Sequence, residues 1–136
     1  MTERYDKFDF IIENDVKIVL IELKTRKNAK NKFNTTYFPT SKITYYKQFK
    51  KSILDNPKNK IVYLLIVFGF PDDTDDLINT SFKYYGIQYK PSYFKDINIS
   101  KNPYCDDYNF NIPIDKLKDI SYYLDILRYK DKNEVI

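Results

Sequence analysis

The chain has no histidine and a single cysteine, Cys105, among its 136 residues. Without histidine there is no Ser-His or Cys-His catalysis, no His-ligated zinc and no nuclease that uses a histidine base. One cysteine forms neither an internal disulfide nor a thiolate zinc site, so we expect Cys105 to be a buried or inert thiol. Because Gly69 and Gly86 are the only glycines, a glycine-rich phosphate-binding loop is not expected either.

Long hydrophobic runs are also missing. The longest, Ile18–Ile21 and Ile61–Phe70, are far too short to cross a bilayer. The N-terminus lacks the basic-then-apolar pattern of a secretory signal. We therefore expect a soluble, intracellular protein without membrane contacts, and its length predicts one domain, residues 1–136.

Acidic residues are absent from Lys24 to Leu54, a stretch that carries nine cations. The rest of the chain holds 14 cations and 19 acids, a net charge of −5. Such a segregated basic segment is typical of proteins that bind a polyanion such as nucleic acid, although it can also be a solvated, lysine-rich face. The nucleic-acid contacts that we predict are Arg26, Lys27, Lys30 and Lys32.

The first half of the chain predicts an α/β fold with a mixed central sheet flanked by helices. Alternating and apolar residues predict a hairpin of strands 6–12 and 16–23, with a turn at Asn14-Asp15. A helix over 42–54, introduced by Pro-Thr-Ser, leads to a second buried strand at 60–68. This strand, helix, strand order predicts a right-handed crossover between two parallel strands.

The second half is less regular. The acidic segment 72–76 predicts a loop or the first turn of a short helix, and 84–89 predicts a strand. An edge segment is expected near 93–99. Apolar residues at helical spacing predict a C-terminal helix from about 115 to 130.

Two carboxylates and a lysine stand out on the predicted hairpin. Glu22 and Lys24 lie on one face of their strand, because side chains alternate. If the hairpin turns about Asn14-Asp15, paired residue numbers sum to 29, and Asp9 faces Leu20. Asp9 and Glu22 then become diagonal neighbours that can share one ion.

A charged side chain within an apolar strand needs a compensating partner, and a divalent cation is one. Mg²⁺ prefers oxygen ligands and is typically held by one or two carboxylates with substrate phosphate. We predict Asp9 and Glu22 as ligands of Mg²⁺, with Mn²⁺ as a possible substitute and the Leu23 carbonyl as a third ligand. Lys24 would orient or activate a metal-bound water. The alternative is a structural ion pair at the strand end.

Helical phase selects one residue of the predicted helix for the site. At about 100° per residue, Lys42 falls on the packed face, whereas Gln48 falls nearly opposite. Lys42 can therefore reach the sheet and bind a phosphate, or it is a plain surface lysine. The packed face is defined by Ile43, Tyr46, Phe49 and Ile53.

Asp9, the triplet Glu22-Leu23-Lys24 and the following helix resemble the PD-(D/E)xK nuclease superfamily, which has the restriction-endonuclease-like fold. Segments 21–26 and 37–42 look most like small phage and giant-virus members. The resemblance implies that Asp9 and Glu22 hold Mg²⁺, that Lys24 assists catalysis and that Lys42 supports the site. It also implies DNA phosphodiester hydrolysis, and a homodimer, since small members that resolve branched DNA are dimers.

Two other functions stay open. A non-catalytic nucleic-acid-binding module would keep the fold and the basic surface without turnover. An interaction domain would instead use some of the 14 tyrosines as a protein interface.

Overall fold

The computed structural model describes residues 8–54 and 60–127, which form two β-sheets, a long helix and several short helices. The larger sheet has the strand order β1, β2, β4, β5, β8, with bounds Phe10–Glu13, Lys17–Thr25, Ile61–Pro71, Phe82–Gln88 and Lys118–Asp119. The smaller sheet has the order β3, β7, β6, with bounds Thr35–Pro39, Tyr108–Pro113 and Ile99–Lys101. The helices are α1 (Thr40–Leu54), α2 (Pro91–Phe94) and α3 (Leu124–Leu127), with 3-10 turns η2 (Ile114–Lys116) and η3 (Ile120–Tyr123).

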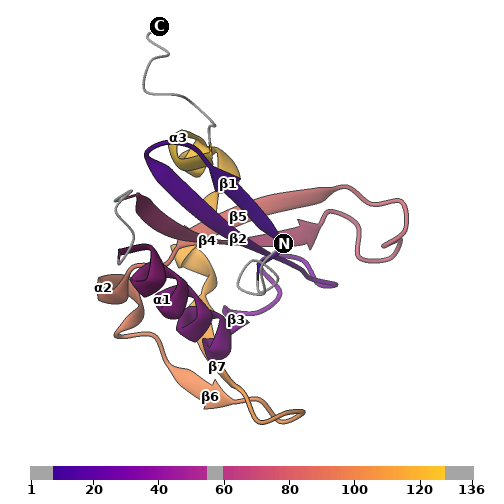
Figure 1. Cartoon of the computed structure of the whole chain (residues 1–136). Helices are drawn as coiled ribbons and strands as arrows, with labels where there is room; N and C mark the ends of the chain where they lie inside the picture. Colours follow the sequence, from indigo (N-terminus) through magenta and orange to yellow (C-terminus); the bar gives the residue numbers. More distant parts are fainter. Residues whose placement is uncertain (1–7, 55–59, 128–136) are drawn as a thin grey trace, which may run out of the picture.

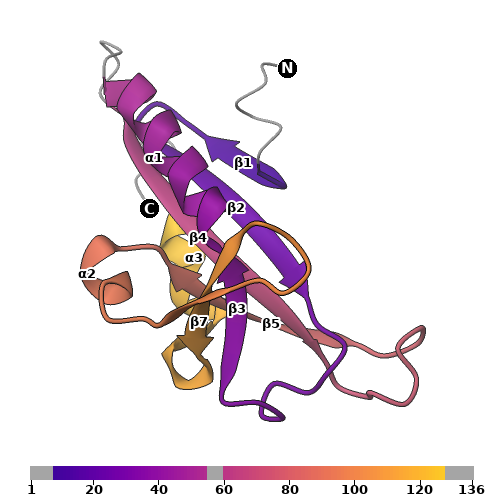
Figure 2. The ribbon, with the colours of Figure 1, turned by 90° about the horizontal axis from the view of Figure 1, so that it is seen from below.

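The larger sheet is covered on both faces. Helix α1 and the smaller sheet lie against one face, whereas η3 and α3 lie against the other (Figures 1 and 2). Successive residues of β2 therefore enter different cores: Leu20 packs in the core beneath α1, and Ile21 packs with Tyr123 on the opposite face. This double coverage explains why β2 and β4 are continuous apolar runs rather than alternating ones.

The predicted crossover is confirmed, because β2 and β4 are parallel and α1 lies between them in the chain. The prediction of a mixed α/β architecture is likewise confirmed. The extra strand β3 within the crossover was not predicted, since residues 35–39 pair only with β7, about 70 residues further along the chain. No helix among the described residues is long and apolar enough to span a membrane.

The hairpin register differs by two from the prediction. Phe10 pairs with Ile21, so paired residue numbers sum to 31 rather than 29. The turn moves because Asn14 Oδ1 accepts hydrogen bonds from the backbone N–H groups of Val16 and Lys17, at 2.9 and 3.0 Å. An Asn side chain that bonds its own backbone in this way nucleates a turn. An even shift keeps the same side chains of the strands on the same face, but Asp9 itself lies just before β1, with its carboxylate directed at the backbone N–H of Leu23.

Helix α1 packs with the predicted face. Ile43, Tyr46 and Phe49 are buried and Gln48 is exposed, while the side chain of Ile53 lies outside the described part of the chain. The helix begins against Asp107, whose carboxylate accepts hydrogen bonds from the hydroxyls of Thr40 at 3.3 Å and Ser41 at 2.7 Å. An anionic acceptor at this end stabilises the first turn.

The predicted C-terminal helix over 115–130 is wrong for the residues that the structure describes; 128–130 lie outside them. In its place are η2, the short strand β8, η3 and α3. Leu117 packs in the core beneath α1, whereas Ile120 and Leu127 pack on the other face of the sheet. One straight helix cannot reach both faces, so the segment crosses the sheet edge as β8.

The other corrections concern the middle of the chain. The expected edge segment at 93–99 is instead α2, opened by Pro91, followed by β6 from Ile99. Strand β7 was not predicted. The loop predicted as one alternative for the acidic segment 72–76 is confirmed. Cys105 is exposed, so the expectation of a buried thiol is wrong, and an inert thiol stays a prediction.

Candidate functional site

Glu22 is the buried acid at the centre of the candidate site. It lies near the end of β2, with 3% of its side chain exposed, and its Oε2 is 3.4 Å from Lys24 Nζ and 3.3 Å from Lys42 Nζ. Lys24 comes from the same face of β2, and Lys42 comes from the first turn of α1. The structure thus brings together three of the residues that the sequence singled out.

The second oxygen of Glu22, Oε1, is buried and has no hydrogen-bond partner among the described residues. A buried carboxylate oxygen without a partner costs free energy, on the order of 1–3 kcal/mol or more for a charged group. Natural proteins retain such an atom mainly where a ligand, ion or water completes it. Glu22 therefore has the geometry of a ligand-binding group rather than of a fully satisfied structural ion pair.

Asp9 is hydrogen-bonded to the backbone of β2 on both sides of Glu22. Its Oδ2 accepts a hydrogen bond of 2.9 Å from the backbone N–H of Leu23, and its own N–H donates to the carbonyl of Ile21 at 3.1 Å. The carboxylate is exposed and lies beside the backbone between Glu22 and Lys24. The backbone N–H and C=O groups of one strand residue point toward the same neighbouring strand. The Leu23 carbonyl is therefore directed toward Asp9, like the Leu23 N–H.

These residues suit Mg²⁺ in kind and in number. The orphaned Glu22 Oε1 and the Leu23 carbonyl, from β2, and the Asp9 carboxylate, from the residue before β1, are hard oxygen donors. Within 8–54 and 60–127 no group of three or more Asp, Glu, Cys or His side chains is arranged so that it could hold a metal ion. A divalent ion here would therefore depend on water and substrate phosphate for its other ligands, as Mg²⁺ commonly does.

Next to Lys24 the chain forms a second functional feature, which we call the basic cavity. It has a volume of about 440 Å³, and its walls include Arg26, Lys27, Lys30, Phe33 and Tyr37. The Lys30 ammonium lies 4.6 Å from the ring centroid of Tyr85, a cation–π distance. Cations interleaved with exposed aromatic rings are typical of surfaces that bind single-stranded nucleic acid.

The four predicted nucleic-acid contacts differ in their surroundings. Arg26 donates to Thr36 Oγ1 at 3.0 Å and to the Tyr37 carbonyl at 2.6 Å, so it holds β3 in place. Burial lowers the pKa of Arg26, with Tyr37 opposing that shift, but a guanidinium stays charged at neutral pH. Lys27 and Lys30 line the basic cavity.

Lys32 does not line this cavity; it donates to Asn28 Oδ1 at 3.3 Å within the same loop. The sequence signal missed the aromatic residues Phe33 and Tyr37, which line this cavity. Phe33 lies in the loop before β3 and Tyr37 lies on β3, a strand that forms only by pairing with the distant β7.

Comparisons of this chain with protein-family models, with curated proteins and with solved structures found no match.

Proposed function

We propose that this protein is a Mg²⁺-dependent nuclease with a restriction-endonuclease-like core, which hydrolyses DNA phosphodiester bonds by metal-activated water. The observation that carries the proposal is the buried Glu22, with one oxygen unpartnered and the other between two lysines. The arrangement of β1, β2, α1 and β4 supports it, because this is the order in which the expected core carries its acid, its Glu-x-Lys triplet and its supporting helix.

In the proposed reaction, Glu22, Asp9 and the Leu23 carbonyl hold the ion. When bound, Mg²⁺ lowers the pKa of a coordinated water and offsets charge that develops on the phosphate. Lys24, with 30% of its side chain exposed, can turn from Glu22 to orient that water. Lys42, with 23% exposed, can donate to a phosphate oxygen from the start of α1.

The substrate would run from this site into the basic cavity. Lys27 and Lys30 would bind backbone phosphates, and Phe33 and Tyr37 would contact sugars or bases. This path also accounts for the missing acids between Lys24 and Leu54, since a carboxylate there would repel the phosphate backbone.

The test is a cleavage assay on a panel of linear, nicked and branched DNA in Mg²⁺ and in Mn²⁺. We expect wild-type protein to cut at least one substrate, and Asp9→Ala and Glu22→Gln each to abolish cutting. Asp15→Asn, which changes an exposed acid in the turn of the same hairpin, is the matched control and should cut normally. Undiminished cleavage by either site variant would refute the proposal.

One observation favours a second function, a nucleic-acid-binding module without turnover. Two ammonium groups already neutralise Glu22 without any metal. Such a module would bind DNA or RNA in a salt-dependent way that does not require Asp9 or Glu22, and no substrate in the panel would be cut.

A further inference from the structure

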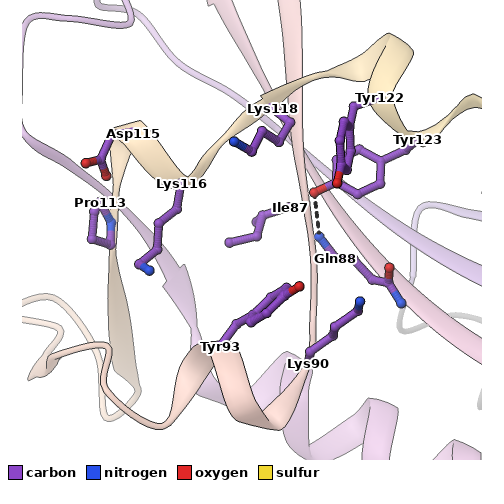
Figure 3. A pocket seen from close by; sticks show the side chains of 10 residues that line it. All are labelled: Ile87, Gln88, Lys90, Tyr93, Pro113, Asp115, Lys116, Lys118, Tyr122 and Tyr123. Carbon is purple, nitrogen blue, oxygen red and sulfur yellow. Dashed lines mark hydrogen bonds between the residues drawn. The ribbon is translucent and has the colours of Figure 1, made fainter.

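A larger cavity lies at the other edge of the main sheet, away from Asp9 and β1. It has a volume of about 600 Å³, within the usual range for a site that binds a small molecule. Its walls come from the start of α2, the end of β5, and the segment from Pro113 through η3 (Figure 3). We call it the tyrosine–lysine pocket, after Tyr93, Tyr122, Tyr123, Lys90, Lys116 and Lys118.

Positive charge is concentrated in this pocket. Three lysines line it against a single acid, Asp115, and Figure 3 shows Lys116 and Lys118 on the wall opposite Tyr93. Within the described chain, none of these lysines forms a salt bridge. The pocket therefore presents uncompensated ammonium groups to an anion.

Aromatic rings supply the second half of the site. Tyr93 and Tyr122 are 50% and 70% exposed. The Lys90 ammonium lies 5.1 Å from the ring centroid of Tyr93, so a planar partner there would stack beside Lys90 or on the other face of the ring. Tyr122 is supported from behind by Tyr123, at 5.1 Å and 79° between the rings. Tyr123 is buried and accepts a hydrogen bond of 3.3 Å from the Gln88 N–H. This hydrogen bond fixes the Tyr122–Tyr123 ring pair to β5.

We propose that the tyrosine–lysine pocket binds one unpaired nucleotide, its base stacked on Tyr93 or Tyr122 and its phosphate held by Lys116 and Lys118. Stacking on tyrosine needs a base whose face is free, and a base inside a duplex offers none. The ammonium groups suit phosphate as point charges. An acidic peptide would use the lysines but would leave the two exposed rings without a planar partner.

This pocket is a separate site from Glu22. Ile87, on the inner wall of the pocket, pairs with Ile66 of β4, and Ile66 pairs with Glu22 of β2. The backbones of Ile87 and Glu22 are therefore two strand spacings apart, about 10 Å. Pro113 and Asp115 line the pocket, whereas Ile114 between them lines the basic cavity. The two cavities therefore share a wall, and, if the proposed function holds, the unpaired nucleotide would belong to the same DNA that is cut at Glu22.

The pocket is tested by binding without catalysis. Glu22→Gln protein in EDTA is titrated with adenosine 5′-monophosphate by calorimetry and with a fluorescent ten-residue oligothymidylate by anisotropy. We expect binding of the mononucleotide, of the oligonucleotide, or of both; binding of the mononucleotide alone identifies a free nucleotide as the ligand. Because this experiment measures binding and not cleavage, its result does not depend on whether the protein is a nuclease.

Matched variants locate the binding. Tyr122→Leu should weaken it by about five- to a hundredfold, whereas Tyr104→Leu, which removes a ring that is 94% exposed in a distant loop, should not. Lys116→Gln should weaken it and reduce the salt dependence by about one phosphate contact. Lys27→Gln, in the basic cavity, should leave mononucleotide affinity unchanged.

Several results would overturn the proposal. No binding of either ligand would do so, as would unchanged affinity in the Tyr122→Leu, Lys116→Gln double variant. Inorganic phosphate that competes as well as the mononucleotide would show an anion site that makes no use of the rings. Oligoglutamate that competes equally well would show a peptide site, and loss of binding in Lys27→Gln alone would place the nucleotide in the basic cavity.

Discussion

At the scale of single residues, the chemistry depends on how Glu22 is surrounded. A carboxylate at the end of a buried strand is expensive to desolvate, and here two partly exposed lysines meet only one of its oxygens. A residue kept for stability alone would have both oxygens satisfied. Under the proposed function, Glu22 is a functional group whose burial is tolerated rather than a source of stability.

This interpretation predicts that Glu22→Met is tolerated in metal-free buffer. Lys24 and Lys42 are exposed enough to reach water when Glu22 is lost, and a methionine fills much of the same volume in the core. Urea unfolding in EDTA should give a free energy of unfolding within about 1 kcal/mol of wild type. A loss of about 3 kcal/mol or more would instead identify Glu22 as a structural ion pair.

At the scale of secondary-structure elements, α1 carries Lys42 to the site, and its first turn depends on Asp107. Burial raises the pKa of Asp107, but hydrogen bonds from Ser41, Tyr108 and Thr40 together outweigh that effect and lower the pKa below its ordinary value. A carboxyl group with a lowered pKa stabilises the fold above its unfolded-state pKa. That stabilisation is lost as pH falls through the lowered value.

Asp107→Asn should therefore lower the free energy of unfolding by about 1 kcal/mol at pH 7, the usual worth of a helix cap. The difference from wild type should shrink as pH falls below about 4, the ordinary value for an Asp, because the wild-type carboxylate becomes protonated as pH falls through its lowered pKa. Urea denaturation at pH 7, 5 and 3 measures this. Asp106→Asn, which changes the exposed neighbouring residue, is the control. A difference in the free energy of unfolding between wild type and Asp107→Asn that stays constant with pH would show that the charge of Asp107 does not stabilise α1.

The two glycines of the main sheet differ in what a side chain would meet. At Gly86 an added Cβ would lie 3.1 Å from two ring carbons of Tyr123, which is buried and hydrogen-bonded. At Gly69 it would lie 2.8 Å from Tyr84, whose exposed ring can move away.

Gly86→Ala should therefore destabilise the protein by about 1–3 kcal/mol, as overpacking of a core does. Gly69→Ala should cost less, because the Tyr84 ring can rotate into solvent. Urea unfolding of both variants, followed by circular dichroism, measures the difference. An equal cost, or the reverse order, would show that Tyr123 is not fixed against β5.

Local patterns predicted some elements and missed others for physical reasons. The hairpin, α1 and β4 are encoded by dense local signals, and the phase of α1 correctly placed Lys42 at the sheet. Strands β3 and β7 depend on each other across the chain, so no local window contains their stabilising contacts. The turn register depended on one side-chain interaction of Asn14 that a count of residues does not reveal.

At the scale of the whole molecule, the two candidate sites lie toward opposite edges of one five-stranded sheet. Asp9 lies just before β1 and Glu22 lies on β2, whereas the tyrosine–lysine pocket is next to β5 and β8. The long crossover from β2 to β4 carries every residue of the acid-free basic segment after Thr25. A nucleic acid that follows this segment would meet the proposed metal ligands first and the basic cavity next.

If Asp9 and Glu22 share one divalent ion, the protein must bind that ion without DNA. Mn²⁺ titration followed by electron paramagnetic resonance measures this directly, since bound and free Mn²⁺ give different signals. We predict saturable binding of one Mn²⁺ by wild-type protein and by Asp15→Asn, competition by Mg²⁺, and loss of the site in Asp9→Asn and in Glu22→Gln. Equal Mn²⁺ binding by wild type and Glu22→Gln, or no binding by wild type, would contradict the proposed metal site.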